Sequence, residues 1–512
     1  GIVCTDDSAF DIADGIDRLR ERVYHLLAAG EAEAARACVI GQREDVLTRG
    51  ASGELLGLID ALEVASGSCE ELVAVRAEIA LRQGRVAEAL ELASTLGDDP
   101  PLGPDDVDLA LLRYRAGEVR DACEDLYDLV CSDDLGLRGR AGAVLAECEL
   151  DRGEHKRAYT VATSTFERDR AKLDRGTRAR LHMALAKWEG RSAAVGSARA
   201  ALARARNAGA LPQASFAEID ARYAVCLSRE GRLEEAYKVI AAAEASARNV
   251  DAVMIADDVR RARALIESRA GGNARAEREL RALVADVRAR GDEIGALRAE
   301  LDLADVFLRC GKVREAGTLA ATVKTGAEPR GLARLVTRAE LVVAAVELEE
   351  LRVADAVERM ESLSLVDAQL ELRAAALKLI ASSWDGDENK EAGANWEQLR
   401  ESCDSSMDAE WIEARAALAR RDSKSALDLA RKVAVAAERS GRVGEMTDAL
   451  AMMARLNLAR GDSAAATSAA TRAAREARVC GLVRAQAQAL ITLAAIARDE
   501  SKVAAASAYA QD

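Results

Sequence analysis

Histidine and cysteine, which often carry nucleophilic or metal chemistry, are sparse or scattered in this chain of 512 residues. The three histidines, His25, His155 and His182, include no pair spaced for a helical H-E-x-x-H zinc site. None of the ten cysteines belongs to a C-x-x-C pair, and no G-x-x-x-x-G-K-[ST] phosphate loop occurs. The sequence therefore predicts no catalytic residue, no metal site and no cofactor.

Composition narrows the partners and the fold. A net charge of −15 disfavours binding to nucleic acid or to an anionic membrane surface, because both need a surplus of Lys and Arg. No apolar run is long enough to span a membrane, and scattered cysteines are typical of a reducing cytoplasm. Aromatic residues make up 3% and prolines number five, while Ala, Leu, Arg and Glu dominate, so an all-α protein without a β-sheet is predicted.

A glycine followed five residues later by an alanine recurs along the chain. Gly231/Ala236, Gly271/Ala276 and Gly311/Ala316 stand at a period of 40 residues. Glycine permits the left-handed turn that ends a helix, and alanine lets the next helix pack closely. Ten further copies are Gly30/Ala35, Gly84/Ala89, Gly117/Ala122, Gly153/Ala158, Gly190/Val195, Leu351/Ala356, Asp387/Ala392, Arg421/Ala426, Gly461/Ala466 and Asp499/Ala504. The pattern predicts a stack of about twelve helical hairpins.

The spacing of these copies divides the chain into three parts. Residues 1–70 are predicted to be a lead-in over 1–15 and capping helices, including one unpaired helix near 52–66. Residues 71–380 hold regular repeats, interrupted by a proline-rich loop at 97–104. Residues 381–512 hold further repeats, with an irregular unit near 382–411.

The small-residue columns over residues 71–512 resemble the tetratricopeptide repeat, although the regular Trp, Tyr and closing Pro of that repeat are missing. The long, Ala- and Arg-rich form resembles the sensor arrays of bacterial STAND-type signalling ATPases and of repeat-bearing Ser/Thr kinases. The resemblance implies a right-handed α-α superhelix whose concave groove binds a protein, peptide or small effector. It also implies a fused or associated ATPase or kinase domain, and a protease domain is a further alternative.

In that geometry, the first helix of each hairpin lines the groove. Arg229, Arg269 and Arg309, each two residues before a turn, would then point inward. The matching inward positions further up the helices hold Arg261, Arg298 and Arg338. These six arginines are candidates for binding carboxylates or phosphates of a partner through paired hydrogen bonds. The alternative is that a cation in the last helical turn only complements the helix dipole.

Three of the four tryptophans, Trp384, Trp396 and Trp411, stand close together around the irregular unit. Tryptophan is a favoured interface anchor, so a partner-binding site is one hypothesis. The other is that large side chains fill a gap left by a missing Gly/Ala contact. Residues 91–135 carry thirteen acidic and three basic side chains. This acidic segment either keeps the protein soluble or binds a basic partner.

The sequence thus predicts a cytoplasmic, non-catalytic, tetratricopeptide-like binding module that serves as sensor or scaffold in a larger bacterial signalling protein. Two alternatives stay open: a stand-alone assembly scaffold, or the regulatory part of a protease or kinase whose active site lies elsewhere. No feature of the sequence identifies the partner.

Overall fold

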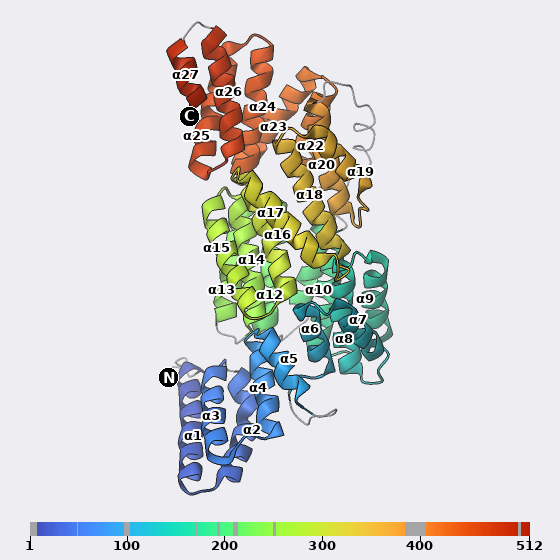
Figure 1. Ribbon diagram of the computed structural model, residues 1–512, viewed down its shortest axis with the longest axis vertical. Helices are drawn as coiled ribbons and strands as arrows, with labels where there is room; N and C mark the ends of the chain where they lie inside the picture. The colour runs from blue at the N-terminus through green and yellow to red at the C-terminus, as the bar shows by residue number, and fades with distance from the viewer. Residues whose placement is uncertain are drawn as a thin grey trace, which may run out of the picture.

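A computed structural model describes residues 8–48, 50–96, 103–169, 172–191, 195–207, 213–248, 252–384, 406–499 and 503–511. All secondary structure in these ranges is helical, and the described residues include no strand. The helices stack in chain order along one elongated molecule, with the N-terminus at one end and the C-terminus at the other (Figure 1). Within the same ranges, no helix is long and apolar enough to cross a membrane.

Most helices form antiparallel hairpins with the next helix in the chain, and we call the earlier member of each hairpin its first helix. The hairpins are α1 (Ser8–Ala28) with α2 (Ala32–Thr48), α4 (Glu70–Arg82) with α5 (Val86–Ser94), α6 (Asp106–Ala116) with α7 (Val119–Val130), α8 (Leu135–Asp151) with α9 (His155–Asp169), α10 (Arg175–Arg191) with α11 (Val195–Arg206), α12 (Gln213–Arg229) with α13 (Leu233–Arg248), α14 (Val253–Arg269) with α15 (Asn273–Ala289), α16 (Glu293–Arg309) with α17 (Val313–Ala327), α18 (Ala333–Glu349) with α19 (Val353–Ser362), α22 (Ser406–Ala419) with α23 (Ser423–Ser440), α24 (Val443–Ala459) with α25 (Ser463–Cys480), and α26 (Val483–Asp499) with α27 (Val503–Gln511). Two described helices stand outside this pairing, α3 (Ser52–Ser66) and α20 (Ala368–Trp384).

The predicted turn explains how each hairpin closes. Gly311 has a φ of 71° and Ala316 is completely buried against the first helix, and the same pairing holds at Gly231/Ala236. Leu351 and Arg421, which replace glycine in the pattern, also adopt the left-handed conformation, with φ of 61° and 59°. The turn is therefore imposed by the packing of the two helices even where the residue type disfavours it.

One predicted turn is displaced. Gly190 lies inside α10 instead of at a turn, and α11 begins at Val195. In the other described hairpins, up to that of α24 and α25, the second helix begins two residues after the turn residue, as Val313 follows Gly311. By that spacing Ala198, which is buried, and not Val195, holds the position of the close-packed alanine. The predicted turn at Gly190 is therefore wrong, and residues 192–194, between the two helices, lie outside the described residues.

The N-terminal part contains the predicted unpaired helix, which is α3 (Ser52–Ser66). Its buried leucines and Ile59 share a separate core with α1, α2 and α4. The lead-in predicted over 1–15 is wrong for residues 8–15, because α1 already begins at Ser8. No proline stands between Ser8 and the middle of α1 to delay the helix. The turn at Asp387 and the proline-rich positions 97–102 lie outside the described residues.

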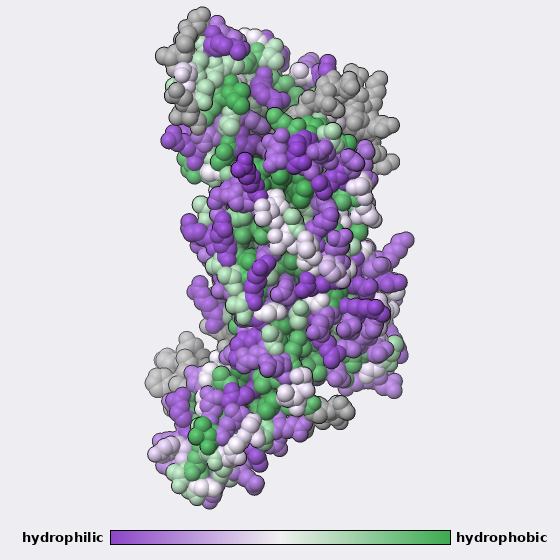
Figure 2. Space-filling view, in the orientation of Figure 1, coloured by the Kyte–Doolittle hydropathy of each residue, from purple (hydrophilic) through white to green (hydrophobic). Residues whose placement is uncertain are grey.

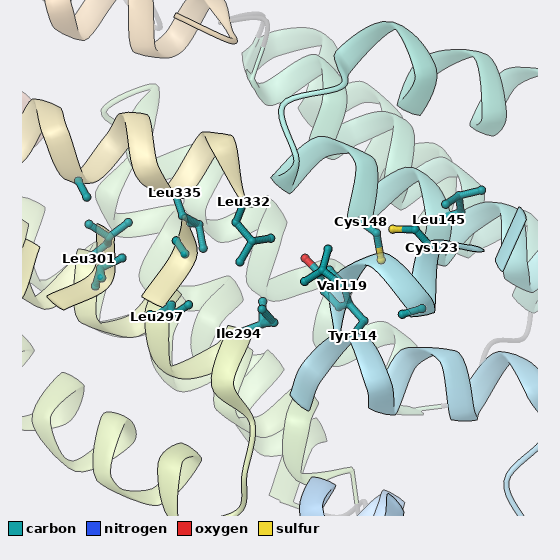
Figure 3. Close-up of a cluster of buried hydrophobic side chains, with 14 of the residues drawn as sticks. Tyr114, Val119, Cys123, Leu145, Cys148, Ile294, Leu297, Leu301, Leu332 and Leu335 are labelled. Carbon is teal, nitrogen blue, oxygen red and sulfur yellow. The ribbon is translucent and has the colours of Figure 1, made fainter. Parts of the chain in front are cut away.

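The solenoid coils tightly enough that one superhelical turn touches the next. We call these contacts the inter-turn seam; they join α6 and α8 to α16, α18 and the start of α20, and α12–α18 to α23–α26. The polar partners lie 135 to 212 residues apart in the chain. Tyr114, Val119 and Cys148 thereby share one apolar core with Ile294 and Leu332 (Figure 3).

Glycine also permits close approach at the seam. A Cβ on Gly271 would lie 2.9 Å from the sulfur of Cys480, and one on Gly311 would lie 2.8 Å from a carbon of Val483. The side-chain amide of Asn273 donates a hydrogen bond to the carbonyl of Cys480 at 3.3 Å. Glycine at these hairpin turns thus serves both the backbone conformation and the contact with the following superhelical turn.

Candidate functional site

Charged side chains of the first helices converge inside the superhelix. Lys187 on α10 lies near Glu218 and Arg222 on α12. Its ammonium group also interacts electrostatically with Asp258 on α14 and Arg298 on α16. Burial and then Arg222 lower the pKa of the Lys187 ammonium well below its usual value. Four first helices therefore bring charged side chains within electrostatic range of one another.

Three of the predicted arginines end their helices and bind the end of the preceding first helix. Arg229 donates to the carbonyl of Gly190 at 3.2 Å, and Arg269 donates to the hydroxyl of Ser228 at 3.0 Å. Arg309 donates to the carbonyl of Ser268 at 3.4 Å. Each guanidinium thus satisfies groups at the C-terminal end of a neighbouring helix, where unpaired carbonyls and the helix dipole favour a cation.

The other three predicted arginines pair with carboxylates of the chain itself. Asp302 accepts from Arg261 at 2.7 Å and from Arg338 at 2.5 Å. Arg338 also binds Asp305 at 2.7 Å. Burial alone would lower the pKa of the Arg338 guanidinium, but Asp302 and Asp305 outweigh it and hold that pKa above its usual value. These side chains form a column of ion pairs along the interior, linking α14, α16 and α18.

The third, Arg298, belongs to a cluster around Asp151 that spans the inter-turn seam. Asp151 on α8 is buried and accepts hydrogen bonds from Tyr114 at 2.7 Å, from Arg191 at 2.6 Å and from Arg298. Burial alone would raise the pKa of the Asp151 carboxyl, but Arg298 and Arg191 outweigh it and hold that pKa far below its usual value. The carboxylate is therefore ionised and shared by two guanidinium groups.

A second aspartate lies beside this cluster, in a region where guanidinium groups outnumber carboxylates. Asp367, just before α20, accepts from Arg334 at 2.7 Å, and the ring of His155 lies 3.7 Å away. Burial, and then the nearby Arg191, lower the pKa of Arg334 to about 10. Nη1 of Arg191 is buried without a hydrogen-bond partner. Arg191, Arg298 and Arg334 thus share two aspartates, and we call these five residues the arginine cluster.

Arg191 and Arg334 were absent from the sequence-based candidates. Arg191 is the last residue of α10, just as Arg229 is the last residue of α12. The misplaced turn at Gly190 hid this equivalence, so a register shifted by three residues would have found Arg191. Arg334 lies in the first turn of α18, a position that the repeat pattern did not single out.

The described residues include two of these three tryptophans, Trp384 and Trp411, and they lie on different helices. Trp411 on α22 is buried in a core with Met407 and Ala414, and the guanidinium of Arg415 lies 4.7 Å from its ring centroid. This placement fits the gap-filling hypothesis for Trp411 better than an exposed interface anchor. Trp384 is the last residue of α20, and Trp396 lies outside the described residues, so their role as an interface stays a prediction.

The described residues bring together no group of three His, Cys, Asp or Glu side chains arranged to hold a metal ion. His155 and His182 lie on different helices: His182 packs against Phe166, with ring centroids 4.8 Å apart, and His155 faces Asp367. His25 lies in the last turn of α1.

Helical hairpins stacked in register, with a close-packed alanine after each turn and polar first helices facing the interior, define an all-α solenoid of the tetratricopeptide-like class. No model of a known protein family matches the chain, and no curated protein matches it in sequence.

Solved structures of helical-repeat proteins are similar at low sequence identity. A Rap protein complexed with competence and sporulation factor has 15% identity and a TM-score of 0.48, covering 65% of this chain and 97% of that chain. Cut9 in the APC/C hetero-tetramer Cut9–Hcn1 has 11% identity and a TM-score of 0.48, covering 91% of each chain. The human IFIT1 dimer with PPP-AAAA has 15% identity and a TM-score of 0.39, covering 91% of this chain and 95% of that chain.

Proposed function

We propose that the chain is a non-catalytic binding scaffold that holds a protein or peptide partner through acidic side chains of that partner at the arginine cluster. The observation that carries the proposal is the local excess of positive charge inside a protein whose net charge is −15. Three guanidinium groups share two carboxylates there, and one buried N–H group of Arg191 has no acceptor.

An incoming carboxylate would supply the missing acceptor. Guanidinium groups bind carboxylates through paired, charge-assisted hydrogen bonds, which are stronger than neutral ones. The side chains of Arg191 and Arg334 are 16% and 11% exposed, so only a small part of each is open to a partner. This position restricts access to an extended segment or a side chain and favours a peptide over a folded surface.

The test uses a fluorescein-labelled hexaglutamate peptide and the full chain, with fluorescence anisotropy read at low and moderate salt. Binding to the unaltered chain is expected, with an affinity that falls as salt rises. The double variant Arg191→Gln/Arg334→Gln should bind at least tenfold more weakly, and Asp367→Asn should bind more tightly. A matched double variant, Arg120→Gln/Arg431→Gln, changes arginines on exposed helix surfaces and should bind normally.

Circular dichroism of each variant establishes that it is folded. Equal loss of binding in the two double variants would show that peptide binding depends on general charge instead of the arginine cluster. No binding by the unaltered chain at any salt concentration would contradict the proposal outright.

We further propose that this scaffold serves as a sensor or regulatory segment of a larger bacterial signalling protein, acting with an ATPase, kinase or protease domain. The support is the sequence resemblance alone. The natural coding sequence tests it: a reading frame that carries none of these domains, with none encoded beside it, would favour the stand-alone scaffold.

A further inference from the structure

Two free cysteines on neighbouring helices face each other inside the molecule. Cys123 lies on α7 and Cys148 lies near the end of α8, and the two residues are buried, with 2% and 1% of their surface exposed. Both belong to the apolar core that crosses the inter-turn seam, and the Cys123 sulfur points toward Cys148 (Figure 3). Mostly hydrophilic side chains cover this part of the molecule, around α7 and α9 (Figure 2). We call Cys123 and Cys148 the thiol pair.

A guanidinium group lies beside the thiol pair. Arg152, the residue that follows α8, has a side chain that is 30% exposed and interacts with the sulfur of Cys123. Its Nη1 atom also donates to the Glu149 carboxylate at 2.8 Å, and the Tyr127 hydroxyl donates to the same carboxylate at 3.1 Å. The negative charge of Glu149 would by itself disfavour a thiolate at Cys123, but these two donors compensate it.

These surroundings give the two thiols different tendencies to lose a proton. Hydrogen bonding from the Cys148 thiol lowers the pKa of Cys123; burial opposes this effect, and the charge of Arg152 adds to it, so that the pKa lies below its usual value. Burial, and then the interaction with Cys123, raise the pKa of Cys148 well above its usual value. Because the thiolate is the reactive form of cysteine, Cys123 is the better nucleophile and Cys148 keeps its proton.

We propose that the thiol pair is an oxidation site at which hydrogen peroxide converts Cys123 and Cys148 into a disulfide that links α7 to α8. In the first step, the Cys123 thiolate attacks one oxygen of the peroxide. The S–O bond forms, the O–O bond breaks, and the departing hydroxide takes up the proton that Cys123 released, which leaves a sulfenic acid and water.

In the second step, the Cys148 sulfur attacks the sulfur of this sulfenic acid. The S–S bond forms, the S–O bond breaks, and the departing hydroxide leaves as water with the proton of Cys148. Two thiols are thereby oxidised to one disulfide, and one peroxide is reduced to two water molecules.

Burial favours a disulfide within the thiol pair over other products. Hydrogen peroxide is nearly as small as water and can enter during brief local opening of the helices, whereas a bulky thiol such as glutathione is hindered there. Cys148 is also the thiol that lies against the sulfenic acid. The disulfide would fix α7 to α8 within the core that both helices share with α16 and α18. This site is separate from the arginine cluster and does not depend on it.

The experiment treats the reduced full chain with hydrogen peroxide, blocks the remaining thiols with iodoacetamide, and maps tryptic peptides by mass spectrometry without reduction. A crosslink between peptides 121–138 and 141–152 is expected, and dithiothreitol should remove it. The first peptide also contains Cys131, which is exposed, so Cys131→Ser is the matched control and should retain the crosslink. Cys148→Ser should lack the crosslink and accumulate a sulfenic acid at Cys123 that dimedone traps. Cys123→Ser should leave Cys148 unmodified.

The rate of crosslinking tests the role of the neighbouring cation. Arg152→Gln should slow the reaction by about threefold or more at pH 7, because the thiolate loses a nearby positive charge. Arg120→Gln changes an exposed arginine on α7 and should leave the rate unaltered. Circular dichroism of each variant establishes that it is folded.

The proposal is overturned if the folded, unaltered chain forms no crosslink between Cys123 and Cys148, or forms it only after unfolding in urea. A crosslink that joins Cys131 instead of Cys123 to Cys148 would also overturn it. So would dimedone trapping at Cys148 in Cys123→Ser with none at Cys123 in Cys148→Ser, because the nucleophile would then be the other cysteine.

Discussion

The guanidinium of Arg298 on α16 binds the carboxylate of Asp151 on α8, although the two residues are 147 positions apart in the chain. Asp151 also accepts from Arg191 and Tyr114, so this single carboxylate connects α6, α8, α10 and α16. An arginine predicted to bind a partner therefore also holds two superhelical turns together. The proposed partner would bind beside this connection, where Arg191 still has a donor to offer.

Asp151→Asn should destabilise the protein strongly. The substitution removes the charge that Arg191 and Arg298 share and leaves two buried guanidinium groups with a weaker acceptor. Removing one partner of a buried ion pair typically costs about 3–5 kcal/mol. Urea unfolding followed by circular dichroism measures the change. Asp121→Asn, at an exposed position of α7, is the control and should change the free energy of unfolding by less than about 0.5 kcal/mol.

The triple variant of Arg229, Arg269 and Arg309 to Gln should lower the stability of the solenoid. Each arginine donates a hydrogen bond to the end of the preceding first helix, and each lost bond is expected to cost about 0.5–1.5 kcal/mol. The melting temperature is the measurement. An unchanged melting temperature together with weakened binding of hexaglutamate would instead favour the groove hypothesis for these three residues.

Asp257 should make stability depend on pH between about 4 and 6. It contacts Arg290 and lies 3.5 Å from Arg260, yet burial, with Asp258 and Asp292 nearby, raises the pKa of its carboxyl to about 6. Because the folded-state pKa is above the unfolded value, the folded state binds the proton more tightly. This contribution to stability therefore grows as the pH falls from 7 to 4 and is lost as the pH rises through 6.

Asp257→Asn removes that titration. Relative to the variant, the unaltered chain should gain about 1–3 kcal/mol between pH 7 and pH 4, since one pKa unit corresponds to about 1.4 kcal/mol. Urea unfolding at four pH values measures the difference. A gap between the two proteins that stays constant with pH would show that the pKa of Asp257 is not raised.

Leu351→Gly and Arg421→Gly should stabilise the protein by about 1 kcal/mol each. Both residues adopt the left-handed conformation, which costs a side-chain-bearing residue about 1–2 kcal/mol, while glycine loses some chain entropy on folding. Leu351 is 74% exposed, so little packing is lost. Thermal unfolding tests the pair, and Gly461→Ala, at a turn with a φ of 81°, should shift the melting temperature in the opposite direction.

Ala316→Leu should overpack the hairpin of α16 and α17. Ala316 is fully buried, and added methylene groups in a close-packed core usually cost about 1–3 kcal/mol. Thr318→Leu, at an exposed position on the same helix, is the control and should be nearly neutral. A neutral effect of Ala316→Leu would mean that the helices can separate at this turn without loss.

The hairpins were predictable because the sequence repeats two small residues at fixed spacing. Gly311 and Ala316 indicate a turn between neighbouring helices, and such a turn can be predicted because its backbone geometry depends on residue type. Four glycines between hairpins were overlooked: Gly291, Gly331, Gly441 and Gly481 also have positive φ and stand midway between the predicted turns. They could have been found by searching for a period of 20 residues as well as 40.

The pairing of the arginines could not be predicted in the same way. Whether Arg298 faces solvent or Asp151 depends on how far each hairpin rotates relative to the preceding one, summed over several repeats. The accumulated rotation cannot be read from the type of any single residue. The buried position of Trp411 likewise follows from packing with α23 and α24, which a sequence window around the tryptophans does not contain.

The inter-turn seam has a mechanical consequence. In an open solenoid, pulling on the two ends would stretch the coil gradually, as a loose spring lengthens. Here Asn273 and the carbonyl of Cys480 are hydrogen-bonded across 207 residues, and similar contacts repeat along the seam. We therefore expect the molecule to resist stretching like a stiff rod and then to extend in discrete steps. Each step would break the contacts that hold one superhelical turn to the next. Inserting or deleting a single hairpin would misalign every seam contact that spans the altered position, so the number of repeats per turn is fixed by the seam.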